Sequence, residues 1–123
     1  MERLVRILKK NGVDVVLSKN PEVTALEFRN AHVSHALSVA EDTGIIFMGG
    51  EEDRRQSALS DHHVVVVRRD VILSDTVSAF LKARNEARII FASNTPSKTA
   101  DIEGTLIYGM HGAIRLTVIL EGE

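Results

Sequence analysis

The chain has 123 residues, of which 44% are apolar and 26% charged, as is usual for a single soluble domain with a sizeable core. Its formal net charge of −2 favours neither nucleic acid nor an anionic membrane surface as a partner. The absence of cysteine excludes disulfides and any cysteine-ligated zinc or iron–sulfur site within this chain. With charges near the N-terminus and no long apolar run, we expect one cytoplasmic domain over 1–123 that carries no cofactor.

Apolar periodicity predicts the first elements. Residues 2–11 place Leu4, Val5 and Leu8 on one side of an amphipathic helix, and Gly12 is positioned to end it. Two short apolar strands that flank E-D-T-G are a hairpin signal. The further expected elements are a strand at 13–17, a turn at 18–21, the start of a helix at 22–30, and the hairpin strands at 36–41 and 45–48.

The second half of the chain alternates strands and helices. Ser74 is expected to cap a helix that ends at Arg84, with Val77, Phe80 and Leu81 on its inner face. The other expected elements are a charged loop with a short helix at 49–60, strands at 62–67, 88–92 and 115–120, and a helix from residue 99. This order predicts an α/β fold with a mostly parallel open sheet, right-handed crossovers and flanking helices.

The stretch 93–112 follows a predicted strand and passes from a polar loop into a helix. Ser97 and Thr99 can cap that helix, and Lys98 adds a positive charge beside its N-terminal N–H groups. Ligands of open α/β sheets bind beyond the carboxyl ends of the strands. Two loops here follow the end of a predicted strand: 68–73 and 93–98. We expect a small anion at the second loop.

Three residues of the same stretch could transfer protons. Glu103 falls on the apolar side of the expected helix, where a carboxylate needs a partner, so it is a candidate catalytic residue. Asp101 lies outside that side and could serve the site or simply complement the helix dipole. His111 lies between glycines near the end of the helix, where it could transfer a proton or favour the dipole as an imidazolium.

The run P-S-K-T-A-D-I-E at 96–103, followed by G-M-H-G at 109–112, resembles the C-terminal signature of the lactate utilisation domain (LUD) family. The resemblance is to the lactate utilisation protein C type, in a short form that lacks most of that type's N-terminal region. The chain departs from the family pattern at Ala113, where the family has proline.

The resemblance continues upstream. V-S-H-A-L-S-V-A-E-D-T-G at 33–44 follows the family pattern and includes Thr43 and Gly44, whose other interpretation is turn chemistry. Ser57 and His63 match a further family segment that precedes a strand. The resemblance implies that these four residues take part in ligand binding together with Ser97, Lys98 and Thr99.

The resemblance covers about residues 33–121 and implies a fold similar to that of sugar-phosphate isomerases and coenzyme A transferases. It implies a non-redox subunit of lactate or hydroxy-acid utilisation, which binds a small anionic ligand and works with iron–sulfur partner proteins. The alternative is a stand-alone small-molecule enzyme of the isomerase or transferase-like group, so catalysis by this chain stays open. Because the family's N-terminal region would otherwise cover part of the domain, we expect a homodimer.

Metal binding is the weaker interpretation of the histidines. His62 and His63 are adjacent on a predicted strand, so their rings face opposite sides. His32 and His35 have ligand spacing only if that segment is helical, and the resemblance argues against a helix there. We therefore expect no metal site in this chain.

Overall fold

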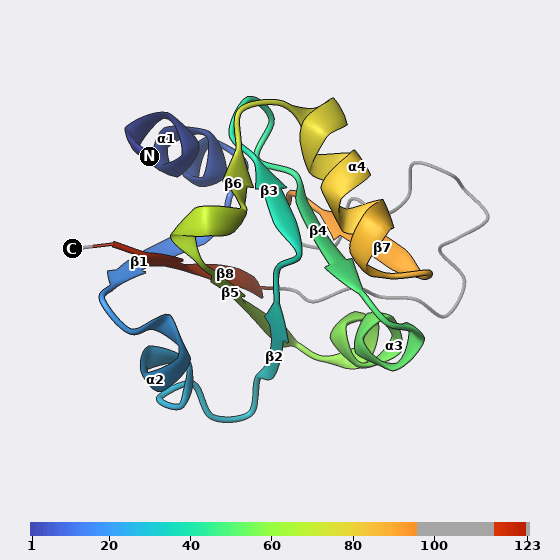
Figure 1. The fold of residues 1–123 in the computed structure, drawn as a ribbon. Helices are drawn as coiled ribbons and strands as arrows, with labels where there is room; N and C mark the ends of the chain where they lie inside the picture. The colour runs from blue at the N-terminus through green and yellow to red at the C-terminus, as the bar shows by residue number, and fades with distance from the viewer. Residues whose placement is uncertain (96–114, 123) are drawn as a thin grey trace.

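The computed structural model describes residues 1–95 and 115–122, whose strands form two four-stranded sheets (Figure 1). In sheet A every neighbouring pair is parallel, and His63 and Val64 of the central β5 pair with Leu116 and Thr117 of β8. Its strands, in spatial order, are β1 (Asp14–Ser18), β8 (Arg115–Glu121), β5 (His62–Val67) and β2 (His32–His35). The α/β class with a parallel sheet is confirmed.

Sheet B is mixed. The expected hairpin is confirmed, because β3 and β4 pair antiparallel around the 41–44 turn. The strand expected at 88–92 also belongs to this sheet and runs antiparallel to β4, not in the parallel sheet with 62–67. The strands, in spatial order, are β6 (Ile72–Leu73), β3 (Ser38–Ala40), β4 (Ile46–Gly49) and β7 (Ile90–Ser93).

The main core lies where α1 and the two sheets meet. Leu4 and Leu8 of α1 pack there with Val65 and Val67 of β5, and all four are fully buried. Val64 and Val66 point to the other face of β5 and pack with residues of α2, so the strand is covered on both faces as expected. The helices within the described residues are α1 (Glu2–Lys10), α2 (Pro21–Ala25), α3 (Glu51–Leu59), the 3₁₀ turn η1 (Arg69–Val71) and α4 (Thr76–Glu86).

Helix α4 differs from the prediction in its cap and in its buried face. Asp75, not Ser74, caps it, because the Asp75 carboxylate accepts a hydrogen bond from the backbone N–H of Ser78. The buried residues are Ala79 and Ala83. Small side chains let the helix approach sheet B closely enough for the Ser38 hydroxyl to donate to the Ala79 carbonyl at 2.6 Å.

Two of the three large apolar residues of α4 expected on its inner face, Val77 and Leu81, are therefore directed outward, whereas the Phe80 ring packs edge-on against Phe47 of β4. Val77 is 68% exposed, Leu81 52% and Phe80 37%. The prediction that Val77 and Leu81 face the core was wrong, because apolar periodicity cannot show which side of a helix a neighbouring strand approaches. Among the described helices, none has the length and apolar character needed to cross a bilayer.

Candidate functional site

Four polar side chains gather at the amino ends of β2 and β5, and we call them the polar network: His32, Ser34, Asp53 and His63. The parallel pairing of the two strands sets His32 beside His63. Ser34 lies two residues further along β2, so it projects from the same face of the strand as His32. Helix α3 packs against β2 and brings Asp53 to this face.

The polar network is continuous. The Ser34 hydroxyl lies 2.7 Å from His63 Nε2 and 2.7 Å from Asp53 Oδ1. The same Asp53 oxygen lies 2.5 Å from His32 Nε2. Ser34 and His63 are buried, whereas His32 and Asp53 are partly exposed. The network thus runs from the interior of sheet A to the surface beside α3.

The Asp53 carboxylate determines the direction of these hydrogen bonds. An ionised carboxylate only accepts, so both the Ser34 hydroxyl and the Nε2–H of His32 donate to it. Ser34 then has no proton left for His63, so His63 carries its proton on Nε2 and donates to Ser34. Each polar atom in this chain of hydrogen bonds has a partner, as burial requires.

Burial, together with the nearby His32 and His62, lowers the pKa of His63 from its ordinary 6.5 to about 4, while the Asp53 carboxylate acts in the opposite direction. His63 is therefore neutral at pH 7. A neutral imidazole linked through a hydroxyl to a carboxylate and a second imidazole can relay a proton between the interior and the surface. The polar network consequently has the residue types that proton transfer requires.

The neighbouring His62 faces the other side of β5, as expected for adjacent strand residues. Its Nε2 lies 2.8 Å from the Thr117 hydroxyl, and its ring packs edge-on against Phe28. Burial and the nearby Arg115 guanidinium lower its pKa. His62 is thus a packing residue that is separate from the polar network.

His32 and His35 both lie in the strand β2, three residues apart, so their side chains leave opposite faces. The helical spacing that would let both rings bind one ion is not present. Within residues 1–95 and 115–122, no three His, Asp or Glu side chains are grouped as metal ligands would be.

Two of the ligand-binding residues expected from the resemblance lie in or near the polar network. His63 is a member of it, and Ser57 lies one helical turn after Asp53 on α3. The Ser57 hydroxyl is already engaged, because it donates to the Arg54 carbonyl at 2.9 Å. Ser57 therefore contributes to the packing of α3, and its binding role stays a prediction.

Thr43 and Gly44 lie elsewhere, in the β3–β4 turn against α1, which Figure 1 places on the other side of the molecule from α3. Gly44 has a φ of +80°, and a Cβ there would lie 3.0 Å from Cγ2 of Ile7. The carbonyl of Thr43 accepts from the Asn11 amide at 3.3 Å. These contacts are those of a turn that needs glycine, and the structure does not bring the pair to the polar network.

Six predicted site residues lie outside the described residues: Ser97, Lys98, Thr99, Asp101, Glu103 and His111. Sequence reasoning named His63 but not its partnership with Ser34 and Asp53. The available signal was weak: β2 reads H-V-S-H, a mostly polar run that was not expected as a strand, and His63 follows another histidine at the start of β5. Nothing in the sequence distinguished Asp53 as a site residue from the other charged residues of its helix.

The fold and the polar network define an α/β protein with a parallel sheet and a buried histidine–serine–aspartate cluster beside it. The LUD domain family model matches residues 26–120, and the chain belongs to this family. Over 118 aligned residues it is 32% identical to lactate utilization protein C of Deinococcus radiodurans. That alignment covers 90% of this chain and 56% of the relative, so the chain spans little more than half of its length.

The fold has a solved counterpart. The crystal structure of a DUF162 family protein from Deinococcus radiodurans superposes with a TM-score of 0.70 and covers 98% of this chain and 95% of that one. The two sequences are 17% identical, so this likeness concerns the fold alone.

Proposed function

We propose that this chain is a small-ligand-binding, non-redox component of hydroxy-acid utilisation, with a lactate-like ligand. The observation that carries the proposal is the 32% identity to lactate utilization protein C over 90% of the chain. The chain has no cysteine to ligate an iron–sulfur cluster, so the electrons of a lactate oxidation would pass through iron–sulfur partner proteins. In this arrangement the partner proteins carry the electrons, and this chain binds the hydroxy acid.

The test is a ligand screen on the purified chain, read by thermal unfolding. A ligand that binds only the folded state stabilises it, by about 2.7 kcal/mol at 100 times its Kd. L-lactate and related 2-hydroxy acids should raise the Tm, and propionate, which lacks the hydroxyl, should raise it less. A Tm that responds to sugar phosphates or coenzyme A esters but to no hydroxy acid would contradict the proposal.

A stand-alone enzyme of the sugar-phosphate isomerase or coenzyme A transferase-like group is the second candidate. The polar network favours it, because Ser34 links a neutral His63 to Asp53, which in turn bonds to the partly exposed His32. Such a chain of groups is what general acid–base catalysis uses. Turnover by the purified chain without partners, lost in Ser34→Ala while the fold is retained, would support this candidate over the binding subunit.

We also propose self-association through α4. Val77 and Leu81 are exposed and lie four residues apart on the same stripe of α4, and Phe80 beside them is half-buried against Phe47. Exposed apolar patches of this kind mark interfaces. Light scattering at tens of micromolar should give a dimer, and Leu81→Lys should shift it to a monomer, whereas Leu26→Lys, at another exposed leucine, should leave it dimeric. A monomeric wild-type chain would contradict the expectation.

A further inference from the structure

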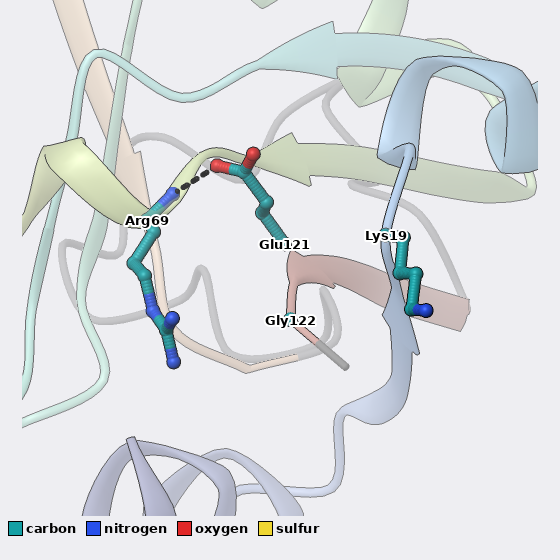
Figure 2. A pocket seen from close by; sticks show the side chains of 4 residues that line it. All are labelled: Lys19, Arg69, Glu121 and Gly122. Carbon is teal, nitrogen blue, oxygen red and sulfur yellow. Dashed lines mark hydrogen bonds between the residues drawn. The ribbon is translucent and has the colours of Figure 1, made fainter.

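A hollow of about 420 Å³ lies at the carboxyl ends of β1, β5 and β8, at the opposite end of sheet A from the polar network. Figure 2 shows the residues that line it: Lys19, Arg69, Glu121 and Gly122. We call it the carboxyl-end hollow. Ligands of parallel α/β sheets bind at this end, where the connecting loops diverge.

Two hydrogen bonds donated by backbone N–H groups hold the walls of the carboxyl-end hollow in place. Lys19 follows β1 directly, and the Gly122 N–H donates to the Ser18 carbonyl at 2.9 Å, which ties β1 to the end of β8. Arg69 follows β5, and its backbone N–H donates to Glu121 Oε1 at 2.9 Å (Figure 2). The three segments are thus fixed relative to one another, and the Arg69 side chain is not used for this.

The charges around the hollow are not balanced. The Arg68 guanidinium forms an ion pair with Glu22 at 2.7 Å and approaches Glu121 at 3.5 Å, so part of the Glu121 charge is already compensated. By contrast, the side chains of Lys19 and Arg69 form no ion pair with any residue in the described part of the chain. In Figure 2 they stand on either side of Gly122. Two cations therefore flank the hollow without an anion of their own.

We propose that the carboxyl-end hollow binds a small molecule through an oxyanion, a carboxylate or phosphate held between Lys19 and Arg69. Glu121 is placed to accept a hydrogen bond from a hydroxyl next to that oxyanion, so a 2-hydroxy acid matches the lining better than a simple carboxylate does. The proposal rests on the proposed function, because it names the place where its ligand binds. It also assigns the ligand to residues that carry no part of the LUD signature.

The test is a set of titrations followed by amide chemical shifts of the full chain, with L-lactate, propionate and inorganic phosphate as separate probes. The amides of Lys19, Arg69 and Gly122 should shift, and those of His32 and Ser34 should not. Lys19→Gln and Arg69→Gln should each weaken binding about threefold, as expected for the loss of one ion pair made by an exposed side chain. Lys10→Gln and Arg84→Gln remove the same charges on α1 and α4 and should leave affinity unchanged.

Lys98→Gln separates this site from the one expected at residues 97–99. If that variant loses binding while Lys19→Gln and Arg69→Gln bind as the wild type does, the hollow is not the site, although the proposed function survives. If phosphate binds at the hollow and L-lactate does not, the oxyanion site stands and the hydroxy-acid function falls. If no probe shifts the three lining amides, the inference is overturned.

Discussion

Leu8→Ala is expected to lower the free energy of unfolding by about 2–5 kcal/mol. Leu8 is fully buried and lies in the core where α1 meets both sheets. Truncation removes the transfer free energy of the lost methyl groups and leaves a cavity. Rigid strands line this cavity on two sides, which limits how far it can collapse. The measurement is urea unfolding followed by circular dichroism.

Leu26→Ala is the matched control, since it makes the same substitution at a leucine that is 80% exposed. It should change the free energy of unfolding by less than about 0.5 kcal/mol. Equal losses for the two variants would mean that α1 does not form part of the core, and that the domain is held together by the strands and the other helices.

The second large effect is a loss of stability in mild acid, caused by His63. Its pKa is lowered to about 4 in the folded chain, against an ordinary 6.5. Between these values the unfolded chain binds a proton that the folded chain does not, so stability falls as pH falls through this range. The full contribution of the single group is roughly 3 kcal/mol, reached below about pH 4.

His63→Gln isolates this contribution from other titrating groups. Glutamine keeps an N–H that can donate to Ser34 but has no proton to gain, so the decline in stability between pH 6.5 and 4 should be shallower in the variant. His62 also has a lowered pKa and is present in both proteins, so its effect cancels in the comparison. Urea unfolding at several pH values measures both slopes, and identical slopes would mean that His63 is accessible to solvent.

Several features of this protein could be predicted from local patterns. The helical stripe of α1, the valine run of β5 and the hairpin around Gly44 each involve residues close in sequence, and the structure confirms all three. The family also followed from sequence, because a contiguous signature identifies it without any knowledge of folding. Such features depend only on residues that are close in sequence, so the periodicity of apolar residues is enough to predict them.

The faces and sites were decided by tertiary structure. Strand pairing sets His63 of β5 beside β2, and the packing of α3 brings Asp53 to Ser34, 19 residues away. Lys19, Arg69 and Glu121 meet only because β1, β5 and β8 end at the same edge of a parallel sheet.

The buried face of α4 was likewise decided by tertiary contacts. Ala79 and Ala83 face sheet B, and Val77 and Leu81 face outward, against the simple hydrophobic expectation. Because the helix packs closely against sheet B, only small side chains fit between them, and this requirement comes from the sheet and not from the helix itself. Local sequence thus predicted α1, β5, the β3–β4 hairpin, the fold class and the family. The pairing of distant strands decided which polar groups meet, because long-range contacts leave no periodic trace in the local sequence.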